Sequence, residues 1–121
     1  MIRGGQDETL RERLRQLAPL TEADEPQWKL WKAQGRAMRN LEASLAKSNP
    51  RALIQMATGS GKTFTAVNVA YRLLKFAGVG RILFLVDRSN LGKQAEDEFA
   101  NFEPPDDPRK FPTLYTVTRM V

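Results

Sequence analysis

The decisive stretch of this sequence is Arg51-Ala52-Leu53-Ile54-Gln55-Met56-Ala57-Thr58-Gly59-Ser60-Gly61-Lys62-Thr63. It begins with a short apolar segment at residues 52–56, which predicts a buried strand. The small residues at 57–61 predict a loop. Apolar residues recur on one face of residues 63–76, which predicts a helix. A strand, a glycine-rich loop and a helix in this order form the context in which phosphate-binding loops occur.

On either side of this stretch, continuous apolar runs alternate with segments in which apolar residues recur at helical spacing. A continuous apolar run at residues 82–86 is typical of a strand buried on both faces of a parallel sheet. Residues 113–118 predict a third strand. We expect further helices at residues 9–18, 27–47 and about 89–102. Because strands alternate with helices, we predict an α/β fold with a short parallel sheet flanked by helices.

The chain changes character near residue 26. Residues 1–26 are polar, and we expect a charged helical and linker segment there. Residues 27–121 are expected to hold the α/β unit, which we interpret as incomplete because the chain ends where a strand finishes. The helix at 27–47 should bury one face, formed by Trp31, Met38, Leu41 and Leu45.

The composition excludes several kinds of site. The chain has 121 residues without cysteine or histidine, so disulfides, cysteine-based zinc sites and Ser-His-Asp triads are ruled out. Its longest apolar run is five residues, against about 20 for a membrane-spanning helix. The first residues do not form a secretory signal. With 19 basic and 14 acidic residues the net charge is +5, which fits a nucleic acid or nucleotide partner.

The glycine-rich loop carries the chemistry of a phosphate site. Gly59 and Gly61 let the backbone turn tightly and bring its amides to the phosphates. Lys62 can place its ammonium between the β- and γ-phosphates, and the Thr63 hydroxyl can bind Mg²⁺. We predict that ATP binds to Thr58, Gly59, Ser60, Gly61, Lys62 and Thr63, with Lys62 as the catalytic residue and Thr63 as the metal ligand. Met56 stands where the general motif has glycine.

Asp87 follows the apolar run at 82–86. It is a second candidate for a residue that helps to hold Mg²⁺. Phosphate-binding loops usually work with a carboxylate at the end of a neighbouring strand. Arg88 follows Asp87 where helicase-like ATPases place a glutamate. The other interpretation is that Asp87 caps a helix or pairs with Arg88.

Three motifs resemble a known family. The segment 51–63 is similar to the Walker A motif of superfamily 2 helicase-like motors, and its Met-Ala-Thr-Gly form resembles the restriction subunit of type I restriction endonucleases. Residues 82–88, with Leu91 and Gln94, are similar to motif Ia of that family. Gln34, followed by Ala37, Met38 and Leu41, resembles the upstream glutamine motif. Here Trp31-Lys32-Ala33 replaces the Arg-Pro-aromatic run common elsewhere.

The resemblance implies a partial RecA-like domain of a cytoplasmic, ATP-driven motor that translocates double-stranded DNA. It implies that Gln34 pairs with the adenine edge, and that Arg88, Ser89, Asn90 and Gln94 contact the nucleic-acid backbone. It also implies the specificity and methylation subunits of a restriction complex as partners.

The family's Asp-Glu box and second motor domain have no counterpart in these residues, so we expect negligible ATP hydrolysis by this chain alone. Two alternatives remain open. One is a small P-loop kinase or other compact NTPase with Asp87 on the magnesium. The other is a non-catalytic fragment that acts by docking onto partner subunits.

Overall fold

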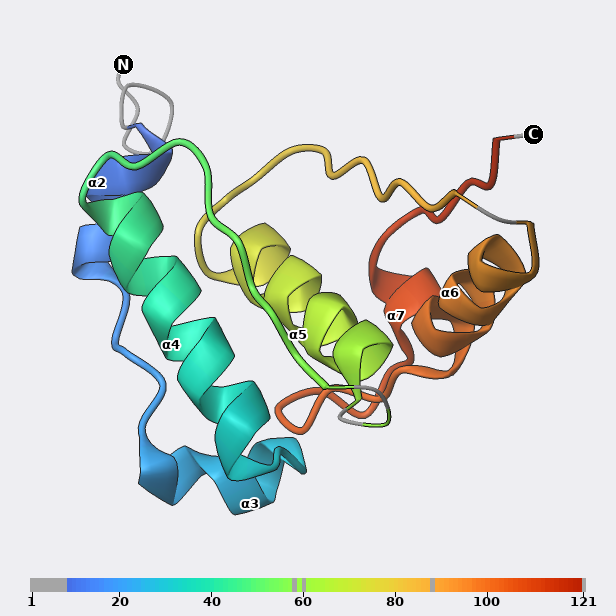
Figure 1. Ribbon diagram of the computed structural model, residues 1–121, viewed down its shortest axis with the longest axis horizontal. Helices are drawn as coiled ribbons and strands as arrows, with labels where there is room; N and C mark the ends of the chain where they lie inside the picture. Colours follow the sequence, from blue (N-terminus) through green and yellow to red (C-terminus); the bar gives the residue numbers. More distant parts are fainter. Residues whose placement is uncertain (1–8, 58, 60, 88, 121) are drawn as a thin grey trace.

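Helices make up the regular structure of the chain (Figure 1). A computed structural model describes residues 9–57, 59, 61–87 and 89–120, without the side chains of residues 89 and 90. The elements in chain order are α2 (Leu10–Gln16), the 3₁₀ turn η1 (Glu22–Asp24), α3 (Glu25–Trp28), α4 (Lys32–Ala46), α5 (Lys62–Lys75), α6 (Ser89–Asn101) and α7 (Phe111–Leu114). None of the helices formed by these described residues is both long and apolar enough to span a bilayer.

The predicted α/β fold with its parallel, partial RecA-like sheet is wrong, because the described residues form no strand. Residues 51–57 and 81–86 have no regular secondary structure. The third expected strand, 113–118, begins inside α7, whose first turn is favoured by a proline. A strand exists only through pairing with a neighbour. Here the two apolar segments, 51–57 and 81–86, are exposed to solvent instead: Leu53 is 91% and Leu85 is 81% exposed.

The helix predictions are confirmed with small shifts of their ends. The expected helix at 9–18 is α2, which Thr9 caps through hydrogen bonds shared with Glu12. The expected helix at 27–47 is divided into α3 and α4, because Lys29 adopts a left-handed conformation at φ 57°. This break changes the helical phase. Trp31 is therefore not in the core as predicted but is 62% exposed, and Trp28 is buried instead.

The core is centred on Tyr71 of α5, which is fully buried. Its ring lies 6.0 Å from that of Trp28 and 5.6 Å from that of Phe102, measured between centroids. Burial raises the pKa of the Tyr71 hydroxyl to about 12. The same hydroxyl donates a hydrogen bond of 2.7 Å to Asp106 Oδ1. Tyr71 thereby fixes the loop at 103–108 against α5.

A buried ion pair joins α4 to α5. Arg72 Nε lies 2.6 Å from Glu42 Oε2, and Arg72 Nη2 lies 3.0 Å from Glu42 Oε1. Both side chains are buried. The guanidinium also lies over the rings of Trp28 and Phe76, at 5.7 and 5.5 Å from their centroids. Because the contact is bidentate, it fixes both the spacing and the register of the two helices.

The arginines of α2 bind near the C-terminal ends of the two long helices. Arg15 Nε donates to the Ala46 carbonyl of α4 at 3.0 Å, and Arg11 donates to the Ser48 hydroxyl at 2.7 Å. Arg13 Nε donates to the Ala77 carbonyl just beyond α5. Cations are favoured there because the last carbonyls of a helix lack partners and carry a partial negative charge.

Gly35 in the middle of α4 is explained by Glu25. The buried Glu25 carboxylate accepts a hydrogen bond of 2.8 Å from Arg39 and packs directly on Gly35. A Cβ at residue 35 would overlap Glu25 Oε2. A side chain at residue 35 would therefore displace the Glu25 carboxylate from its position beside Arg39.

We predict that Gly35→Ala lowers the free energy of unfolding by about 1–3 kcal/mol, as expected for overpacking. The matched control is Gly92→Ala in α6, where a Cβ would make only ordinary contact with Val86. That control should be neutral or stabilising because alanine favours helix. Urea unfolding followed by circular dichroism compares the two variants. Equal stability of both would contradict the steric explanation.

We predict that Arg72→Leu costs about 3–5 kcal/mol, because it leaves the Glu42 carboxylate buried without its partner. The double variant Arg72→Leu/Glu42→Leu should recover most of this loss, since no buried charge then remains. A double-mutant cycle in denaturant measures both values. A double variant as unstable as the single one would show that packing, not the unpaired charge, dominates.

Candidate nucleotide-binding site

The glycine-rich loop leads directly into the N-terminus of α5. Gly59 has φ 79° and Gly61 has φ 75°, conformations that favour glycine. Gly61 precedes the first residue of α5, and its carbonyl accepts hydrogen bonds from the Thr65 amide at 3.0 Å and the Thr65 hydroxyl at 2.9 Å. Lys62 is exposed and Thr63 half-buried in the first turn. The predicted ligands Thr58 and Ser60 lie outside the described residues.

Gln34 of α4 connects that helix to the loop. The Gln34 side chain is 3% exposed. Its Oε1 accepts from the Trp31 amide at 2.8 Å, and its Nε2 donates to the Gly61 carbonyl at 3.2 Å. A Cβ at residue 61 would overlap Gln34 Nε2. The structure thus brings together Gln34, Gly61 and Lys62, three of the residues that sequence analysis selected. Pairing of Gln34 with adenine stays a prediction.

The described residues among those expected to contact DNA belong to α6. Ser89 and Asn90 begin α6, Gln94 is exposed on the same helix, and Arg88 lies outside the described residues. Figure 1 shows the start of α6 well away from the N-terminus of α5. Next to Gln94, Lys93 forms an ion pair of 2.8 Å with Asp97, which raises the pKa of Lys93. Contact with nucleic acid stays a prediction.

The described residues could hold a magnesium ion only together with a bound nucleotide that supplies further oxygen ligands. Within those residues no group of three or more carboxylates could hold a metal alone. Asp87 is exposed in the segment that leads to α6. Thr63, in the first turn of α5, is placed beside the loop. Its hydroxyl is the oxygen that would complete a shell made mainly of phosphate oxygens and water.

A cavity of about 770 Å³ lies beside the first turn of α5. Its lining includes Trp28, Lys29, Phe64, Glu98, Phe102 and the loop 103–108. Sequence analysis did not find it, because its walls come from three separate parts of the chain. The available signals in the sequence were Phe64, directly after Lys62 and Thr63, and the three prolines within residues 103–108.

Ion pairs fix the acidic loop of this cavity. Asp106 accepts from Tyr71 and forms an ion pair of 2.9 Å with Lys75. Hydrogen bonds of Lys75 with Tyr71 and with Asp106 raise the pKa of Lys75. Hydrogen bonds from the side chain and backbone of Arg109 lower the pKa of Asp107 to about 2. Both carboxylates are therefore already engaged with partners of their own.

Comparison with known proteins gives consistent results. The chain matches the family described as "Type III restriction enzyme, res subunit" over residues 27–117. It is 46% identical over 66 residues to the "Type I restriction enzyme EcoKI endonuclease subunit" of Escherichia coli strain K12, covering 54% of this chain and 6% of that protein. It is 38% identical over 71 residues to the EcoAI endonuclease subunit of Escherichia coli, covering 59% and 8%. No solved structure matches the chain.

We predict that Gly61→Ala lowers the free energy of unfolding by about 2–4 kcal/mol, since it adds a clash with Gln34 to the cost of a left-handed conformation. Gly59→Ala is the matched control: its φ is similar, but a Cβ there would meet nothing within 4 Å. It should cost only about 1–2 kcal/mol. Adding Gln34→Ala to Gly61→Ala should recover part of the loss. Thermal unfolding of these three variants tests this, and equal losses at 59 and 61 would exclude a steric role for Gln34.

Proposed function

This chain belongs to the family of the type III restriction enzyme res subunit, and we propose that it supplies the ATP-binding part of a DNA-translocating motor. The observation that carries the proposal is the left-handed glycine loop at the N-terminus of α5, with Lys62 exposed in the first turn. Unpaired amides and the helix dipole make such a terminus suited to phosphate. Lys62 adds a full positive charge beside them.

In this proposal each residue of the loop has a distinct task. The amides near Gly59 and Gly61 bind phosphate oxygens, and the Lys62 ammonium neutralises charge on the β- and γ-phosphates. Thr63 contributes its hydroxyl to the Mg²⁺ that accompanies ATP. Gln34 holds the Gly61 carbonyl, and with it the loop, against α4.

The proposed complex, its partner subunits and its DNA substrate are inferred from the names of the matched relatives. Two matched relatives are named as endonuclease subunits of type I restriction enzymes, and the matched part of this chain covers 6% and 8% of their lengths. We infer that the region acts within a multisubunit restriction complex on double-stranded DNA. Specificity and methylation subunits are the proposed partners. Arg88, Ser89, Asn90 and Gln94 are the proposed contacts to the DNA backbone.

The test is a calorimetric titration of Mg·ATP into the chain. We expect saturable binding that Lys62→Ala weakens by about ten- to a hundredfold, the value of a charge-assisted hydrogen bond. Lys47→Ala, which removes the same charge from an exposed site beyond the end of α4, should have no effect. Absence of binding to the folded wild-type chain would contradict the proposal. It would favour the docking fragment, for which the exposed Leu53 and Leu85 are the supporting observation.

A further inference from the structure

We propose that two copies of this chain associate through residues 81–87, which pair as antiparallel extended segments across a twofold axis. The segment reads Arg81-Ile82-Leu83-Phe84-Leu85-Val86-Asp87. Within the described part of a single chain it has no pairing partner. The proposal concerns a surface distinct from the loop before α5, and it does not depend on nucleotide binding.

The backbone of residues 81–87 is open to a partner. The segment forms no helix or strand, and no backbone hydrogen bond joins it to another of the described residues. Figure 1 shows the chain between α5 and α6 passing along an outer edge of the helices. Unpaired amides and carbonyls in such a position can form a ladder of hydrogen bonds with another extended chain.

Exposure alternates along the segment with the period of two that is characteristic of a β-strand. Leu83 and Leu85 are 64% and 81% exposed, whereas Phe84 between them is 38% exposed. Phe84 packs on Phe99 of α6, with the two rings edge to face and their centroids 5.7 Å apart. The segment is therefore attached to its own chain through Phe84 at its centre, and the two leucines are left largely uncovered.

The residue types in the segment follow the same order in both directions from Phe84. A leucine stands on each side of Phe84, and a β-branched residue follows at 82 and at 86. In an antiparallel pair centred on Phe84, Leu83 of one copy lies opposite Leu85 of the other. A twofold interface requires such self-complementarity, because both copies use the same surface.

The charged ends of the segment favour the antiparallel direction and a second copy as the partner. Arg81 and Asp87 are each three residues away from Phe84. Antiparallel pairing puts Arg81 of one copy opposite Asp87 of the other at both ends of the contact. Parallel pairing in register would put like charges opposite each other, which is unfavourable. An apolar segment without charged ends would supply no counterpart to either residue.

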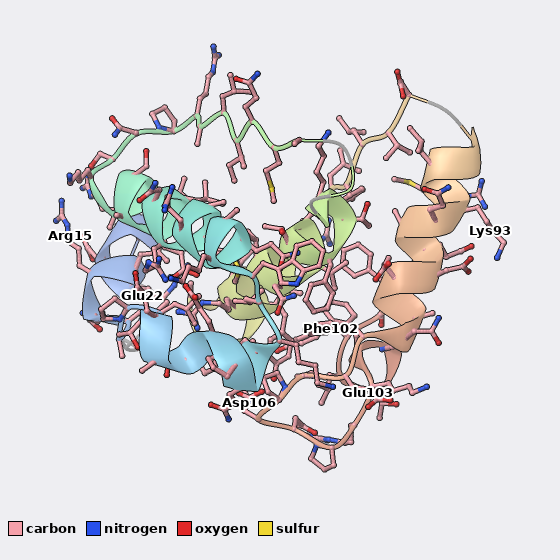
Figure 2. All side chains as sticks on the ribbon, turned by 60° about the horizontal axis from the view of Figure 1, so that its bottom comes forward. Arg15, Glu22, Lys93, Phe102, Glu103 and Asp106 are labelled. Carbon is pink, nitrogen blue, oxygen red and sulfur yellow. The ribbon has the colours of Figure 1, made fainter. Side chains whose placement is uncertain are left out.

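Both charges are available for this contact. Arg81 and Asp87 are exposed, and no ion pair joins either of them to a residue within the described ranges. Lys93 on the following helix is directed outward in Figure 2 and forms its ion pair of 2.8 Å with Asp97 of the same helix. Asp87 is therefore able to accept a cation from another molecule.

Sedimentation equilibrium at several concentrations measures the association. We expect the mass of the wild-type chain to rise from 13.7 kDa to about twice that value and no further. Leu85→Lys should raise the dissociation constant about tenfold, since it removes a leucine from two cross-strand pairs and adds like charges. Leu53→Lys is the matched control, because Leu53 is also almost fully exposed but belongs to the other apolar segment. It should leave the association unchanged.

Charge reversal tests the direction of pairing. Arg81→Asp and Asp87→Arg each create two like-charge contacts in an antiparallel dimer, so each variant alone should dimerise at least about fivefold more weakly than the wild type. An equimolar mixture of the two variants should dimerise again, because both contacts in the mixed pair join opposite charges. The double variant Arg81→Asp/Asp87→Arg should also dimerise as the wild type does.

Four results would overturn the inference. The first is a wild-type chain that stays at 13.7 kDa up to its highest soluble concentration. The second is a mass that grows beyond two copies, which would indicate open aggregation. The third is an equal loss in Leu53→Lys and Leu85→Lys, which would indicate a non-specific apolar contact. The fourth is a mixture of the two charge variants that associates no better than either variant alone. None of these results bears on the binding of Mg·ATP, which is measured separately.

Discussion

The buried contact between Glu42 and Arg72 is the interaction on which the remaining arrangement depends. It ties α4 to α5 toward their C-terminal ends, and the hydrogen bond from Gln34 to the Gly61 carbonyl ties the same helices at the other end. Two attachments at separate points fix the register as well as the distance of a helix pair. The conformation of the loop before α5 is therefore set by residues on α4, and not by the glycines alone.

Tyr71 performs a comparable task for the other side of the site. Its ring occupies the centre of the aromatic core, and its hydroxyl holds Asp106. Lys75, also on α5, adds an ion pair of 2.9 Å to the same carboxylate. Two residues of α5 thus position the outer wall of the cavity, while Phe64, two turns before Tyr71, forms the inner wall.

Sequence reasoning found the helices and missed the tertiary relations. The apolar periodicity within residues 9–18 and the apolar face of α5 are local signals, and local signals are enough to predict a helix. The apolar run at 82–86 indicated only that these side chains prefer burial. It could not supply a pairing partner, and strands depend on one. The glycine-rich loop before α5 could be predicted because its residues are contiguous in the sequence. The contacts of Gln34 with Gly61 and of Glu25 with Gly35 join distant residues and leave no local pattern.

The arginines of α2 have a consequence for where this unit should be delimited. The similarity to the restriction family begins at residue 27, after α2. A chain shortened to that boundary would lose Arg11, Arg13 and Arg15, and the carbonyls of Ala46 and Ala77 would be left to solvent. Those carbonyls lie at the far ends of the helices whose near ends hold Gln34 and the phosphate loop. The structural unit therefore begins earlier in the chain than the region of sequence similarity, because it includes α2.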